Sequence, residues 1–132
     1  MPSERFPPDD PREWMNRARS NLIQARQQSP GVYLEDLCFN AQQAAEKAIK
    51  ALLLHRAVQF PYIHDIAKLL NLLREAGENI PPQIEDADAL TQYAVGTRYP
   101  TSEEPVTQQE YEEALALAEA VVRWAEERLQ AE

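Results

Sequence analysis

The stretch from Phe39 to Leu53, FNAQQAAEKAIKALL, constrains the fold more than any other part of the chain. At about 3.6 residues per turn, one narrow face of this predicted helix carries only small and aliphatic side chains. They are Leu37, Ala41, Ala44, Ala45, Ala48 and Leu52. Small side chains let another helix approach closely, so this face predicts a helix in the middle of a helical bundle.

The opposite face of the same helix is polar and carries one aromatic ring. It holds Phe39, Gln43, Glu46 and Lys50. One interpretation is a solvated surface, on which Glu46 and Lys50 form a weak pair one turn apart. The other is a surface prepared for a partner or a ligand, and the residues alone leave both open.

Proline and glycine positions divide the chain into five predicted helices. Their approximate ranges are 10–28, 32–57, 64–76, 82–95 and 107–129. A capping Asp10 precedes Pro11 at the first start, and Thr107 with Glu110 predicts a capping box at the last. The expected buried sets are Trp14, Ala18, Leu22 and Ala25 in the first helix, Ile84, Ala87, Leu90 and Ala94 in the fourth, and Tyr111, Leu115, Ala118, Val122, Ala125 and Leu129 in the last.

These patterns predict a single all-α domain over residues 1–132. No segment has the alternation of a strand, and the expected architecture is an antiparallel up-and-down bundle of about five helices. Residues 1–9 are expected to form a flexible N-terminal segment.

Charge is distributed unevenly along the chain, whose formal net charge is −9. Residues 1–56 carry eight basic and seven acidic side chains, whereas residues 57–132 carry five and fifteen. Generic binding to nucleic acid is not expected, because it depends on clustered Lys and Arg. An anionic ligand is expected to prefer the first half or Arg98, although a solubilising surface also explains the acidic half.

The single Cys38 excludes an intrachain disulfide and a Cys-based zinc site, which favours a reducing cytoplasm. The N-terminus has no apolar signal segment, and no membrane span is expected. Catalytic templates are missing, since there is no glycine-rich phosphate loop, metalloprotease helix or nucleophile elbow. His55 and His64 lack a third ligand at a regular spacing, so no metal site is predicted.

Two further segments carry candidate functional side chains. The Arg98 guanidinium suits bidentate recognition of phosphate, and the Tyr99 ring next to it suits stacking on a base. Alternatively, Arg98 pairs with an acidic neighbour, and Tyr93 or Tyr99 packs beneath the loop. His64 and Asp65 either start the third helix together or form a functional pair.

Three features together resemble the HEPN domain family, whose name stands for higher eukaryotes and prokaryotes nucleotide-binding. They are FNAQQAAEKAIKALL, the His64-Asp65 pair that opens a leucine-rich helix, and the segment from Tyr93 to Thr97-Arg98-Tyr99-Pro100. The resemblance extends from about Asp10 to Leu129. It implies an all-α bundle similar to the C-terminal domain of kanamycin nucleotidyltransferase, and association as a homodimer or higher homo-oligomer. In prokaryotes it also implies a separately encoded minimal nucleotidyltransferase as partner, and some such pairs are toxin–antitoxin systems.

Ribonuclease members of that family carry an Arg that is followed a few residues later by a His. Here Arg98 stands at the Arg position, but Glu103, Glu104 and Pro105 occupy the positions of the His. Without that imidazole, proton transfer from a ribose hydroxyl lacks its usual agent, so cleavage of RNA is disfavoured. The resemblance therefore implies a non-catalytic protein, without a cofactor, that binds a nucleotide or a nucleotidyltransferase partner.

In this first hypothesis Arg98 contacts the phosphate and Tyr99 or Tyr93 contacts the base. The neighbouring helix surface contributes Gln43, Lys47 and Lys50. A second hypothesis is a self-association or protein-interaction module without a ligand, based on the alanine face and the heptad-like last helix. The third is a metal-independent ribonuclease toxin.

Overall fold

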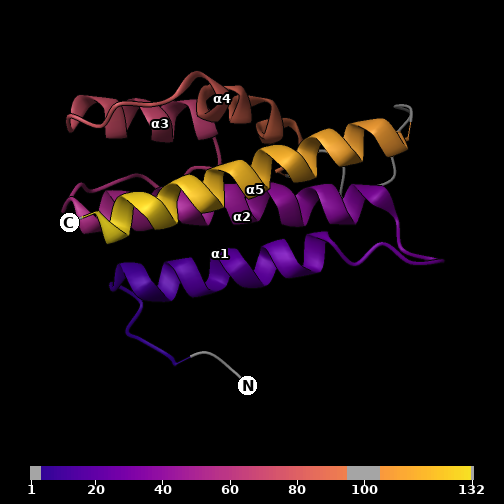
Figure 1. The fold of residues 1–132 in the computed structure, drawn as a ribbon, viewed down its shortest axis with the longest axis horizontal. Coiled ribbons are helices and arrows are strands. Elements are labelled where there is room, and N and C mark those ends of the chain that lie inside the picture. Colours follow the sequence, from indigo (N-terminus) through magenta and orange to yellow (C-terminus); the bar gives the residue numbers. More distant parts are fainter. Residues whose placement is uncertain (1–3, 95–104, 132) are drawn as a thin grey trace.

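The computed structural model describes residues 4–94 and 105–131, and within these two ranges the chain forms helices and no strand. The elements are α1 (Pro11–Ala25), α2 (Leu34–His55), α3 (Ile66–Glu75), α4 (Pro82–Glu85), the 3-10 helix η1 (Asp86–Tyr93) and α5 (Gln108–Gln130). Figure 1 shows them gathered into one bundle. The predicted all-α helical bundle is confirmed.

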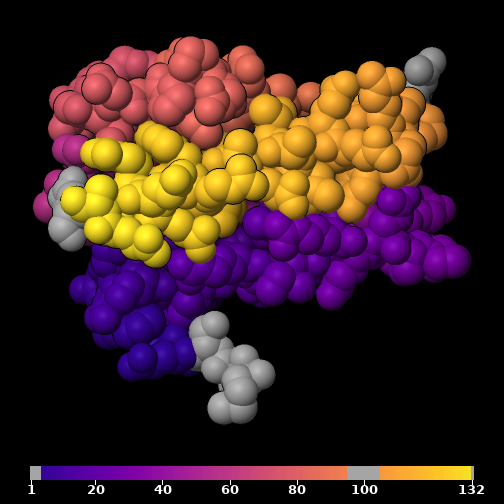
Figure 2. Space-filling model, viewed as in Figure 1, coloured from indigo at the N-terminus to yellow at the C-terminus, as the bar shows by residue number. Residues whose placement is uncertain are grey.

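The alanine-rich α2 lies at the centre of the bundle, as its sequence predicts. It packs against α1, α5, α3 and η1, and every residue of its predicted core stripe is buried. Figure 2 shows α5 running across the front of the molecule, between α3 and α4 on one side and α1 and α2 on the other. Neighbours on several sides explain why burial extends around most of the circumference of α2.

Helix directions alternate except at one connection. Residues 56–65 double back along α2, which brings His64 within 2.9 Å of Glu46 in the middle of that helix. The other end of α3 meets the end of α2, where Arg56 Nη1 donates to the carbonyl of Ala76 at 2.8 Å. The α2 and α3 helices therefore run in the same direction.

The predicted helix starts are confirmed by their caps. The Asp10 side chain accepts from the backbone N–H of Arg12, and Thr107 with Glu110 forms the reciprocal capping box. The first helix ends earlier than predicted, at Ala25, whose carbonyl accepts the Tyr111 hydroxyl at 2.6 Å. That buried bond satisfies one of the carbonyls that a helix end leaves without an intrahelical donor.

The second helix also ends early, at His55 rather than residue 57. Ala57 has a left-handed backbone with φ of 58°, and the N–H of Val58 reaches back to the carbonyl of Leu53 at 2.8 Å. This is a Schellman-type ending, in which a left-handed residue closes the last turn. An alanine in this conformation carries a steric cost that a glycine would not. Because no glycine marks the position, the sequence does not predict that the helix ends here.

The predicted fourth helix has a different winding from the one expected. A single α-turn at Pro82–Glu85 passes into the 3-10 helix Asp86–Tyr93. Its buried side chains are Ile84, Ala87, Leu90 and Tyr93, which recur every third residue. That period matches about three residues per turn, so the 3-10 form puts all four into the core.

The core face of α5 is broader than the predicted seam. Leu115 and Leu129 are only partly buried, whereas Ala114, Val121 and Trp124 are buried. The reason is that α5 packs against α1, α2, α4 and η1 together, and not against one helix along a single seam. In α1, Met15 is buried in the same way and the predicted Trp14 is only partly buried.

Candidate functional site

A row of buried polar side chains follows one side of α2. Gln42, Glu46 and Lys50 recur every fourth residue, so they share a face, and all three are buried. Glu46 is 3% exposed and Lys50 is 2% exposed. The prediction that these two lie on the helix surface is therefore wrong.

The Glu46 carboxylate is the hub of this row. Its Oε2 accepts from Lys50 Nζ at 2.8 Å, and its Oε1 accepts from Gln42 Nε2 at 2.8 Å. His64 Nδ1 lies 2.9 Å from the same Oε1. We call Gln42, Glu46, Lys50 and His64 the α2 polar cluster. Three partners satisfy the carboxylate, as a buried charge requires.

Three aromatic rings enclose the Lys50 ammonium. Its Nζ lies 5.9 Å from the ring centroid of Trp14, 5.4 Å from that of Phe60 and 5.6 Å from that of Tyr62. The Trp14 and Phe60 rings meet edge to face, with 6.0 Å between their centroids. Ring faces attract a cation and exclude water, so Lys50 is held inside the protein and is not offered to a ligand.

His64 and Asp65 have separate roles. Asp65 caps α3 by accepting from the backbone N–H of Lys68 at 3.2 Å, which confirms the helix-start interpretation for this residue. His64 links the α2 polar cluster to solvent: its side chain is 37% exposed and its ring lies 5.5 Å from that of Tyr62, which is 91% exposed. If Nδ1 donates to Glu46, Nε2 is left as an acceptor.

Lys47, on the side of α2 that faces α1, is a half-buried cation with neutral partners. Its Nζ donates to Asn21 Oδ1 at 2.7 Å, and Asn21 in turn donates to Asn40 Oδ1 at 2.9 Å. Burial lowers the pKa of Lys47; the negative charge of Glu46 opposes this shift, while the positive charges of Arg17 and Lys50 add to it. No carboxylate of the described chain lies within ion-pair distance of this ammonium. Such a cation favours an anionic ligand.

Tyr93 lies in the core at the opposite end of α2, beside Cys38. Burial raises the pKa of Tyr93 to about 12, and the negative charge of Glu110 acts in the same direction. Burial also raises the pKa of the Cys38 thiol to about 12, so this cysteine is an inert core residue at neutral pH. Because α2 rises by about 18 Å from Cys38 to Lys50, Tyr93 and Lys50 cannot contact one small ligand.

The remaining predicted site residues have different outcomes. Gln43 is half-buried and donates to Gln42 Oε1 at 2.7 Å, one turn from Lys47. Arg98 and Tyr99 lie outside the described residues. Asn21 was not predicted as a site residue. Its amide reaches Lys47 only because α1 packs on α2, which the sequence alone does not show. The spacing of four between Gln42, Glu46 and Lys50, beside an alanine stripe, is the signal that indicates a buried polar row.

Two negative findings concern the described ranges, residues 4–94 and 105–131. No three side chains of His, Cys, Asp or Glu there are grouped so that they could hold a metal ion. No helix in these ranges is both long enough and apolar enough to cross a membrane.

Known proteins match the chain over nearly its whole length. The sequence model of the HEPN domain matches residues 11–129. The structure of TT1696 from Thermus thermophilus is similar, with 38% sequence identity, a TM-score of 0.77, and coverage of 89% of this chain and 96% of that one. No curated protein matches at a significant level.

Two further solved structures are similar at lower identity. ST0689, described as an archaeal HEPN homologue, is 28% identical with a TM-score of 0.73, covering 90% of this chain and 97% of that one. An HEPN domain protein from Thermotoga maritima, tm0613, is 26% identical with a TM-score of 0.69, covering 89% of this chain and 97% of that one.

Proposed function

This chain belongs to the HEPN domain family, and from that membership we propose that it is a non-catalytic protein which binds a nucleotide through Lys47. The observation that supports this site is the half-buried ammonium of Lys47, whose partner is an amide oxygen of Asn21 and not a carboxylate. A phosphate supplies the negative charge that this position lacks. Charge-assisted hydrogen bonds of that kind are the strong ones in proteins.

Neighbouring side chains add polar contacts to the proposed phosphate site. The Asn21 and Gln43 amides lie next to Lys47, and the Arg17 guanidinium, which is paired with Glu13 Oε2 at 3.0 Å, is close enough to lower the pKa of Lys47. We assign Arg98 to a second phosphate contact and Tyr99 to the base, as the family resemblance implies. Lys50 and Tyr93 have no place in the proposed contact set, since the structure buries both.

Calorimetric titration with ATP and GTP at low salt tests the nucleotide site. We expect Lys47→Gln to weaken binding at least about tenfold, because it removes a charge-assisted contact of about 1.5–3 kcal/mol. Lys68→Gln is the matched control: Lys68 is an exposed lysine on α3, and its loss should leave affinity unchanged. The proposal fails if the wild-type protein shows no binding at millimolar nucleotide, or if Lys47→Gln binds as tightly as the wild type.

Absence of ribonuclease activity is the second part of the proposal. Neither of the two histidines of this chain, His55 and His64, lies after Arg98. We therefore expect purified protein to leave single-stranded RNA intact and its expression to be harmless to the host. Growth arrest or cleavage that disappears in Arg98→Ala would establish the toxin alternative and contradict this part.

The proposed partners are a separately encoded minimal nucleotidyltransferase, in a pair of toxin–antitoxin type, and a second copy of the chain. Membership of the HEPN domain family supports the first of these. Exposed apolar side chains around the end of α1 and the start of α2 support self-association, since monomer surfaces seldom expose many large apolar groups. These side chains are Ile23, Val32 and Tyr33.

A further inference from the structure

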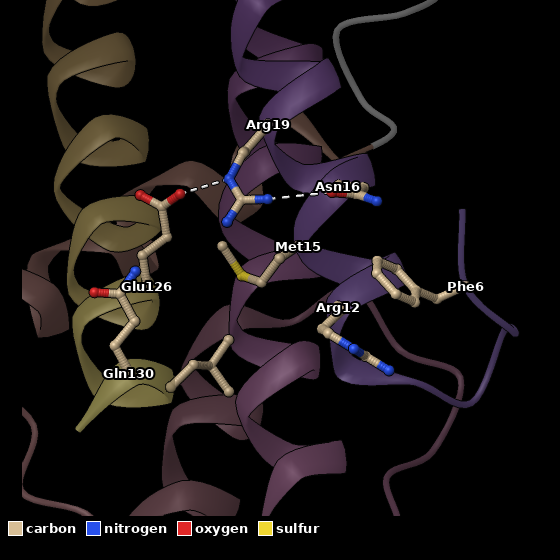
Figure 3. Close-up of a pocket in the computed structure, with 8 residues that line it drawn as sticks. Phe6, Arg12, Met15, Asn16, Arg19, Glu126 and Gln130 are labelled. Atoms are coloured by element: carbon tan, nitrogen blue, oxygen red, sulfur yellow. Dashed lines mark hydrogen bonds and ion pairs between the residues drawn. The ribbon is translucent and has the colours of Figure 1, made fainter. Parts of the chain in front are cut away.

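A cavity of about 360 Å³ lies where the N-terminal segment, α1 and the end of α5 meet. Figure 3 shows its lining from these three parts of the chain. Apolar walls come from Phe6, Met15 and Leu129, and charged groups come from Arg12, Arg19 and Glu126. This volume is at the lower end of the range typical of small-molecule sites.

The outer wall of the cavity is held in place by specific contacts. Residues 4–9, which belong to the segment 1–9 expected to be flexible, lie along α1. The backbone N–H of Phe6 donates to the buried Glu13 carboxylate at 3.0 Å, and the Arg12 guanidinium lies 4.0 Å from the Phe6 ring centroid. The Asn16 amide also donates to the carbonyl of Glu4 at 2.7 Å. These contacts place Phe6 as one wall of this space.

Arg19 offers an unused donor to the cavity. Its Nε is paired with Glu126, and its Nη1 donates to Asn16 Oδ1 at 3.2 Å. Nη2 forms no hydrogen bond to any residue in the described parts of the chain. In Figure 3 this third nitrogen points into the space beside Met15. A guanidinium nitrogen directed at apolar walls favours a ligand that brings an acceptor with it.

We propose that this cavity binds a small aromatic carboxylate. The carboxylate accepts from Arg19 Nη2, and the ring lies between Phe6, Met15 and Leu129. Inorganic phosphate is a poorer fit, because the three apolar walls cannot replace its hydration. An apolar cation is a poorer fit, because the lining holds two guanidinium groups against the single carboxylate of Glu126. The cavity is separate from Lys47, so ligand binding there does not depend on the proposed nucleotide site.

The Trp14 indole can report ligand binding in this cavity. The Trp14 indole Nε1 donates to the carbonyl of Pro8 at 2.6 Å, which ties the indole to the same N-terminal segment that carries Phe6. A ligand that packs against Phe6 is expected to shift the Trp14 indole N–H resonance. The second indole, Trp124 on α5, does not line the cavity and provides an internal reference.

Titration of ¹⁵N-labelled protein with 2-naphthoate, followed by NMR, tests the proposal. We expect saturable shifts of the Trp14 indole and of Met15 and Leu129, with affinity reduced at least about tenfold in Arg19→Gln. The exposed Arg123→Gln on α5 is the matched control and should bind as the wild type does. The neutral analogue 2-naphthylmethanol should bind at least about tenfold more weakly than 2-naphthoate.

Arg19→Gln is expected to fold, since a partly exposed ion pair such as Arg19–Glu126 contributes little to stability. A second variant, Leu129→Trp, fills the cavity and should abolish the shifts while thermal unfolding stays near that of the wild type. No saturable shift in the wild type at millimolar 2-naphthoate would overturn the proposal. Equal affinity in Arg19→Gln, or shifts centred on Lys47, would also overturn it.

Discussion

Lys50→Met is expected to lower the free energy of unfolding by about 3–5 kcal/mol, although methionine keeps most of the apolar stem of lysine. The substitution leaves the Glu46 carboxylate, which is 3% exposed, without its only ion-pair partner on α2. Uncompensated buried charge is among the most costly defects in a folded protein. Since the free energy of unfolding of such domains is about 5–15 kcal/mol, this loss removes a large part of the total stability. Urea denaturation followed by circular dichroism measures it.

The double variant Glu46→Gln with Lys50→Met separates the charge effect from packing. Removing both charges should restore stability to within about 1–2 kcal/mol of the wild type, because no uncompensated ion remains. Lys68→Met, at an exposed lysine on α3, is the surface control and should change stability by less than about 0.5 kcal/mol. If Lys50→Met alone unfolds at the same urea concentration as the wild type, the buried pair does not stabilise this fold.

The central position of α2 and the helix starts could be predicted because each depends on a local sequence pattern. The alanine stripe of α2 has one plausible environment, a close contact between helices, and the structure places it there. The caps at Asp10, Asp65 and Thr107 satisfy backbone groups within a few residues in sequence, so they are also readable in advance. The 3-10 winding of η1 was not predicted, because the sequence was assigned an ordinary helix with Ala94 on its apolar face, whereas the buried residues of the structure recur every third position up to Tyr93.

The burial of Lys50 could not be predicted from the sequence, because it depends on the path of the segment that connects α2 to α3. Helical periodicity gives the angle at which a side chain leaves the helix, but it does not say which segment covers that angle. Phe60, Tyr62 and His64 reach the middle of α2 only because residues 56–65 double back along it. The side chains predicted to lie on the surface thus form a buried cluster, whereas Lys47, about 100° around the helix from Glu46, is only half-buried beside Asn21.

Ala45→Leu is expected to lower the free energy of unfolding by about 3 kcal/mol, the upper part of the usual range for overpacking. Ala45 is 0% exposed and α2 packs directly against both α1 and α5, so three added carbon atoms must force helices apart. Leucine is nearly as good a helix former as alanine, so the local stability of α2 is preserved and the loss reports packing alone. Urea denaturation measures the change. Ala116→Leu, at an exposed position of α5, is the matched control and should stay within about 0.5 kcal/mol of the wild type. An Ala45→Leu protein as stable as this control would show that the alanine face is loosely packed, and the close helix contacts inferred from it would be wrong.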